Sequence, residues 1–143
     1  MASSASDRAA VAPVQRFAQA FGAVYLLVGL LGFAFTGFSN FAGSEGDVEI
    51  IFEVNPLHNI VHIAVGAVWL LASRTEAAAR GVSTLIGAVY LLLGVAGFLL
   101  VGTSANILAL NTPDHFLHLA TAGLALYFGL AGRRAAAPTA PAA

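Results

Sequence analysis

All four histidines of this 143-residue chain lie in two short segments that also contain asparagine and proline. Residues 55–62 read Asn-Pro-Leu-His-Asn-Ile-Val-His, and residues 111–118 read Asn-Thr-Pro-Asp-His-Phe-Leu-His. Imidazole nitrogens combined with a carboxylate are ligands suited to Zn²⁺, Cu(II), Fe or Mn. Ionisable side chains are costly inside an apolar segment that could lie in a membrane, which marks both segments as functional candidates.

Within each segment, two ionisable side chains lie four residues apart and therefore share one face of a helix. His58 pairs with His62 in this way, and Asp114 pairs with His118. These four residues form the predicted metal site, provided that the two helices meet. The side chains expected to support these ligands are Asn55, Asn59, Asn111, His115, Tyr25 and Tyr90.

Two other interpretations of the histidines stay open. In the first, His62 and His118 are axial ligands of haem b across a helical bundle. In the second, the cluster only hydrogen-bonds internally and to nearby hydroxyl and backbone groups, as a staple in a structural accessory subunit of a larger membrane complex. The sequence contains no nucleophile–base spacing and no phosphate-binding loop, which favours a non-enzymatic role.

Composition indicates a membrane protein, because 59% of the residues are hydrophobic and only 9% are charged. The net charge is −1 and the arginines form no long basic run, which argues against nucleic acid as a partner. The expected partners are membrane lipid and either further copies of this chain or a larger membrane complex.

Four apolar stretches predict four membrane spans, at about residues 17–38, 56–73, 81–103 and 113–132. The first has 22 residues, which as a helix reaches about 33 Å and crosses the hydrocarbon. Asn55 and Asn111 are good N-caps, and a proline follows each of them at the start of the helix. We expect residues 39–54 to form a loop, residues 1–16 a disordered leader and residues 133–143 a disordered tail.

All arginines fall on one side of this four-span arrangement, and the chain has no lysine. They are Arg8, Arg16, Arg74, Arg80, Arg133 and Arg134. The positive-inside rule makes that side cytoplasmic, so the chain is expected in the inner or plasma membrane with both termini in the cytoplasm. The histidines then lie at the outer ends of their helices.

An internal repeat connects the two halves of the chain. Residues 22–33 read GAVYLLVGLLGF and residues 87–98 read GAVYLLLGVAGF, and the two histidine segments follow them in the same order. Each copy contains two spans, so both copies insert the same way up. The predicted fold is an all-α membrane protein, a four-helix bundle built from two parallel-repeat helical hairpins.

The two histidine segments, the repeated Gly-Ala-Val-Tyr sequence and the four-span length resemble an uncharacterised bacterial integral membrane family, domain of unknown function 4383. The resemblance covers roughly residues 15–133. It implies a four-helix integral membrane protein and no established activity, so the chemistry rests on the residues themselves.

Overall fold

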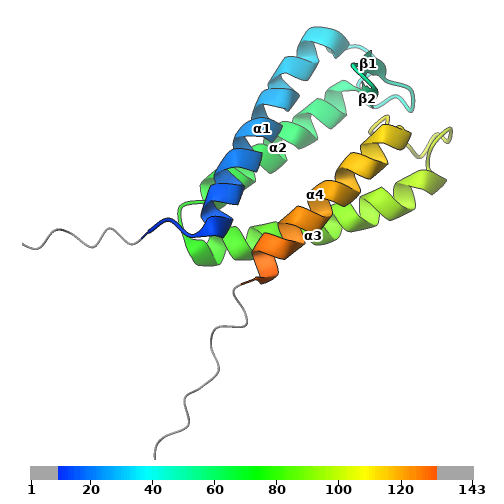
Figure 1. Ribbon diagram of the computed structural model, residues 1–143. Coiled ribbons are helices and arrows are strands. Elements are labelled where there is room, and N and C mark those ends of the chain that lie inside the picture. Colours follow the sequence, from blue (N-terminus) through cyan, green and yellow to red (C-terminus); the bar gives the residue numbers. More distant parts are fainter. Residues whose placement is uncertain (1–9, 132–143) are drawn as a thin grey trace, which may run out of the picture.

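A computed structural model describes residues 10–131 of the chain, and Figure 1 shows their arrangement. The helices are α1 (Pro13–Thr36), α2 (Pro56–Ala72), α3 (Glu76–Ala96), which continues into the 3-10 turn η1 (Gly97–Leu99), and α4 (Thr112–Leu130). Two short strands, β1 (Asp47–Glu49) and β2 (Phe52–Val54), lie between α1 and α2. In residues 10–131 the regular structure is therefore helical apart from one small β-hairpin. Residues 1–9 of the predicted leader and the whole predicted tail, residues 133–143, lie outside the described residues, as does residue 132.

Helix α1 begins at Pro13, four residues before the start of the predicted span. Proline suits the first helical position, and the Gln15 side chain accepts a hydrogen bond from the Ala12 backbone N–H at 3.0 Å. Gln15 also donates to the backbone oxygen of Ser73 at 2.9 Å, which joins the start of α1 to the end of α2. Residues 13–16 are thus helical, and the prediction of a disordered leader is wrong for them.

Helix α3 also differs from its predicted range of 81–103, because it begins at Glu76 and its α-helical part ends at Ala96. The Thr75 hydroxyl caps the first turn by accepting from the Ala78 N–H at 3.2 Å, and Arg80 pairs with Glu76 at 2.6 Å. Residues 76–80, which precede the predicted span, therefore form the first turn of the helix.

The predicted loop 39–54 contains the antiparallel pair β1–β2, in which Asp47 lies opposite Val54 and Glu49 opposite Phe52. A two-residue turn at Ile50 and Ile51 joins the strands. The sequence shows no Asn-Gly or Asp-Gly turn signal at this point, so the hairpin was not predicted.

The helices pack as two hairpins, α1 against α2 and α3 against α4 (Figure 1). Glycine permits the close approach in both. A Cβ atom added at Gly22 would lie 2.9 Å from the backbone oxygen of Gly66, and one added at Gly87 would lie 3.2 Å from the backbone oxygen of Ala122. Small residues at helix contacts are typical of helices packed in lipid.

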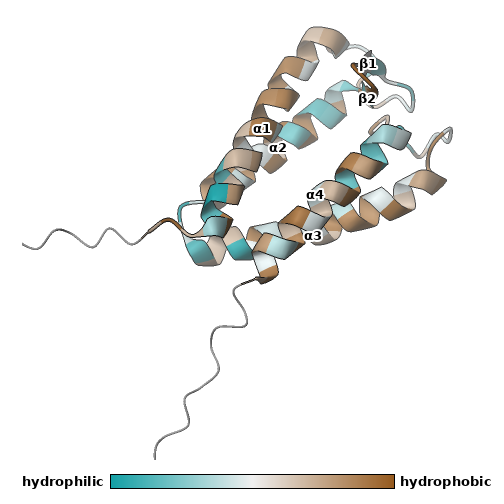
Figure 2. Cartoon of the chain, viewed as in Figure 1, coloured by the Kyte–Doolittle hydropathy of each residue, from teal (hydrophilic) through white to brown (hydrophobic). Residues whose placement is uncertain are grey.

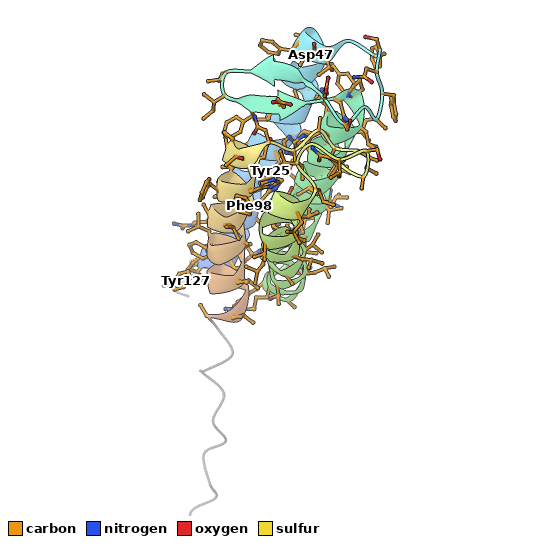
Figure 3. The ribbon with its side chains drawn as sticks, turned by 90° about the vertical axis from the view of Figure 1, so that its right-hand side faces the viewer. Tyr25, Asp47, Phe98 and Tyr127 are labelled. Carbon is orange, nitrogen blue, oxygen red and sulfur yellow. The ribbon has the colours of Figure 1, made fainter. Side chains whose placement is uncertain are left out.

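Aromatic residues form the centre of the bundle. Trp69 is fully buried and contacts the rings of Phe17 and Tyr25 edge-on, with centroids 5.7 and 5.3 Å away. Its indole N–H donates to the hydroxyl of Ser83 on α3 at 3.2 Å, which links the two hairpins. Figure 3 shows Tyr25 inside the bundle, between the Asp47 end and the Tyr127 end.

Within the described residues, two helical segments are long and apolar enough to cross a membrane, Pro13–Thr36 and Glu76–Leu99. Helix α2 is also apolar but has only 17 residues. Large apolar side chains such as Leu31 and Leu92 point outward and are exposed. Both segments could therefore lie in lipid.

Candidate metal centre

The two histidines of α2 lie in its first two turns because of the way this helix begins. Pro56 takes the first helical position, and the Asn55 side-chain oxygen accepts a hydrogen bond from the His58 N–H at 2.8 Å. This cap fixes where the helix starts, so His58 and His62 point to the same side. In Figure 2, the hydrophilic parts of α2 and α4 lie toward the end that carries β1 and β2.

Three histidines meet between the hairpins. One ring nitrogen from each of His58, His62 and His118 lies within 4.8 Å of the other two. His58 Nε2 and His62 Nε2 are 3.2 Å apart. All three side chains are buried, with 1%, 8% and 3% of their surface exposed. The predicted convergence of α2 and α4 side chains is found for these three residues.

Several nitrogens in this cluster have no hydrogen-bond partner in the protein. They are the Nδ1 atoms of His58, His62 and His118. A buried polar group without a partner costs about 1–3 kcal/mol. His58 and His62 face each other through Nε2, so an ion shared between them would bind Nε2 and leave the Nδ1 atoms on the far side of each ring.

Asp114, predicted as a fourth ligand, has a different set of contacts. Its carboxylate accepts from the Asn111 N–H at 3.0 Å, while its own N–H donates to the Asn111 side chain at 3.2 Å. This reciprocal pair is the capping box that starts α4. Among the described residues, the group of ligand atoms that lie within reach of one ion consists of the three histidines.

The two tyrosines predicted to support the site do lie against it. Tyr25 stands edge-on to His62 with ring centroids 5.1 Å apart, and Tyr90 stands edge-on to His118 at 4.8 Å. The Tyr25 hydroxyl donates to the Thr121 hydroxyl at 3.2 Å. Tyr25 thus packs on His62 in the first hairpin, and Tyr90 packs on His118 in the second. Each tyrosine limits how the histidine ring beside it can turn.

Asn59 and His115 lie away from the cluster, inside the two hairpins. Asn59 donates to the Thr36 hydroxyl at 3.0 Å, and His115 packs on the ring of Phe98 at 4.7 Å. Both side chains are fully buried. Neither ring nitrogen of His115 has a hydrogen-bond partner. These two predicted supporting residues therefore belong to the packing within each hairpin.

The asparagines that cap α2 and α4 close the end of the bundle above the histidines. The Asn55 amide donates to the backbone oxygen of Ile107 at 2.8 Å, and the Asn111 amide donates to the backbone oxygen of Ile51 at 3.0 Å. Each cap therefore holds the loop that precedes the other histidine-bearing helix. The Asn55 amide also donates to Gly43 at 2.9 Å.

Comparison with known proteins identifies one matching family, described as Domain of unknown function (DUF4383), whose match covers residues 15–131. The chain belongs to this family. No curated protein and no solved structure matches the chain. The family description assigns no activity, so the function of this DUF4383 chain has to be inferred from its site.

Two features of this DUF4383 site were missed in the sequence. The Asn-x-x-Asp spacing at 111–114 is the pattern of a capping box, and it would have separated Asp114 from the ligands. Thr36, the hydrogen-bond partner of Asn59, lies on the same buried face of α1 as Gly22, Gly29 and Gly32, and it was not among the predicted supporting residues.

Proposed function

We propose that this DUF4383 chain is a four-span membrane protein that holds a divalent transition-metal ion on His58, His62 and His118. One observation carries the proposal: three buried imidazoles, from two helices, place a ligating nitrogen within 4.8 Å of one another. An ion shared by these rings would join α2 to α4 and so hold the two hairpins together.

The ligand set favours a particular class of ion. Three neutral imidazoles suit Zn²⁺, Cu(II) or Fe(II) better than Mg²⁺ or Ca²⁺, which prefer oxygen. Three protein ligands also leave a tetrahedral ion with one open position, as in metal sites that bind an exchangeable ligand. Asp114 is engaged in its helix cap, so we assign it a positioning role.

We further propose that the two hairpins are copies related by a pseudo-two-fold axis along the membrane normal. Ile51 and Ile107 are 56 residues apart, as are Asn55 and Asn111, and their hydrogen bonds are reciprocal. Reciprocal contacts of this kind are the mark of a two-fold interface. The matching placement of Tyr25 on His62 and Tyr90 on His118 supports the same axis.

The proposed topology has four spans with both termini in the cytoplasm. The first residues of α1 and the last of α4 lie at one end of the bundle, opposite β1 and β2 (Figure 1). Arg16 in α1, Arg74 after α2 and Arg80 in α3 lie near that end, and Asp47 lies at the other. The positive-inside rule makes the arginine end cytoplasmic and the histidine end external.

The geometry supports a metal ion better than haem. His58 Nε2 lies 3.2 Å from His62 Nε2, so a third imidazole occupies space that a macrocycle axial to His62 and His118 would need. The cavity beside His62 measures about 130 Å³, whereas pockets for drug-sized ligands are typically about 300–1,000 Å³. A haem would require the hairpins to separate.

Metal analysis and thermal unfolding of the detergent-purified protein test the proposal. Wild type should retain a metal ion, and free metal at about 100 times its dissociation constant should stabilise the fold by about 2.7 kcal/mol. The double variant His62→Ala/His118→Ala should lose both effects. His115→Asn is the matched control, because it removes a buried histidine outside the cluster and introduces the residue found at the repeat-equivalent position 59.

Two results would contradict the proposal. A wild type without bound metal or metal-dependent stabilisation would support the alternative of hydrogen-bonded staples in an accessory subunit. A Soret band in the purified protein, lost in the double variant, would support haem.

A further inference from the structure

A narrow apolar groove between α1 and α4 leads to the histidine cluster. It has a volume of about 130 Å³. Its lining residues are Phe21, Val24, Tyr25, Val28, His62, Leu117 and Thr121. Among the three clustered histidines, His62 is the most exposed, at 8%, and it is the one that lines this groove. The groove therefore reaches one ligand of the proposed metal ion from the side of the bundle.

A second groove lies between the hairpins at α2 and α3, with a volume of about 350 Å³. Its walls include Val61 and Leu93, which occupy the same repeat positions as Leu117 and Val28 of the first groove. No histidine lines it among the described residues. The chain thus contains two related grooves, of which the one at α1 and α4 reaches the cluster.

The histidine cluster is covered at the end of the bundle that carries the strands. Asn55 and Asn111 fasten the two outer loops across it, and the nearby residues Val54, Ala109 and Leu110 are buried. The end of the bundle is therefore closed, and a small molecule that reaches the cluster through the α1–α4 groove passes between apolar walls. These walls favour a neutral molecule, because a charge placed between them would lose its hydration.

We propose that this groove admits a small neutral diatomic ligand, of the class of nitric oxide and dioxygen, from the hydrocarbon to the open coordination position beside His62. The inference rests on the metal site proposed above. The groove is smaller than the pockets of about 300 Å³ or more that hold drug-sized molecules, but it has space for a diatomic molecule. The ligand would take the position that the three imidazoles leave open, a water held there would leave as the exchanged ligand, and no bond to the protein would break.

The test measures nitric oxide binding to the Fe(II)-loaded protein in lipid nanodiscs, without oxygen, by stopped-flow absorbance and by the EPR signal of the iron nitrosyl. Val28→Trp fills the groove that reaches His62, and Leu93→Trp fills the related groove as a matched control. We expect Val28→Trp to slow association by about tenfold or more and Leu93→Trp to leave it unchanged within about twofold. Leu117→Trp and its counterpart Val61→Trp repeat the comparison if the first variant misfolds.

Azide serves as the control for a charged ligand that arrives from water. It should bind far more slowly than nitric oxide, because the apolar groove favours a neutral molecule. The inference is overturned if no nitrosyl forms, if both tryptophan variants bind nitric oxide as wild type does, or if azide binds as fast as nitric oxide. Metal content measured on the same samples separates the two proposals. A wild type that holds no metal refutes the metal site. A metal-loaded protein in which Val28→Trp does not change the rate of nitric oxide binding refutes only the role of the groove.

Discussion

Replacing Asn55 with alanine should destabilise the protein more than any other change to a helix cap. The Asn55 side chain is 1% exposed and makes hydrogen bonds to three segments. It accepts from the His58 N–H at 2.8 Å, and it donates to Gly43 at 2.9 Å and to Ile107 at 2.8 Å. One amide thus joins the start of α2, the first outer loop and the loop before α4.

The magnitude follows from these contacts. Loss of the cap costs about 1 kcal/mol. Two carbonyl oxygens lose their amide donor, at about 1 kcal/mol each when the loops relax, so Asn55→Ala should cost about 3 kcal/mol. Asn111→Ala loses a similar cap, but its bond to Ile51 is exposed and water replaces it, so the expected cost is about 1–1.5 kcal/mol.

Asn55→Asp separates the two contributions. Aspartate keeps the acceptor for the His58 N–H but cannot donate, so this variant should retain the cap and still lose about 2 kcal/mol. Equilibrium unfolding by SDS in mixed micelles measures all three variants. The reasoning is refuted if Asn55→Asp is as stable as wild type, or if Asn55→Ala and Asn111→Ala differ by less than about 0.5 kcal/mol.

Three further predictions concern packing, pH and topology. Gly29→Ala should destabilise the protein by about 2 kcal/mol, because the new Cβ would lie 2.5 Å from the backbone oxygen of Asn59. Gly123→Ala meets open space, so it should be neutral or stabilising by up to about 1 kcal/mol in the same unfolding assay. Metal-dependent stabilisation should persist at pH 6 and fade only below about pH 5, because protons compete with the metal for imidazole but burial disfavours the charged form of all three rings; loss of the gain already between pH 7 and 6 in thermal melts would contradict ligation by these buried histidines. Cysteines introduced at Ser44 and Thr139 should react with impermeant maleimide from opposite sides of the membrane, and reaction of both from outside would refute the topology.

Much of the local structure could be predicted from the sequence. Asn55-Pro56 and Asn111-Thr112-Pro113 mark the starts of α2 and α4 because side-chain caps and a fixed proline φ act within a few residues. The shared face of His58 and His62 follows from helix geometry alone. The start of α3 at Glu76 was missed because charged residues there form a capped helical turn, and β1–β2 was missed because no turn signal precedes Ile50.

The tertiary structure decided which of the candidate residues form the site. Spacing along the helices assigns Asp114 and His118 equally to the α4 face, but only His118 joins His58 and His62. Asp114 lies in the first turn, where its carboxylate caps the helix, while His118 lies one turn further into the bundle. The groove at His62 likewise depends on α1 and α4, which are far apart in the sequence. Helix starts and faces are local properties that residue types determine, whereas contacts between helices depend on how the glycine-containing hairpins pack together.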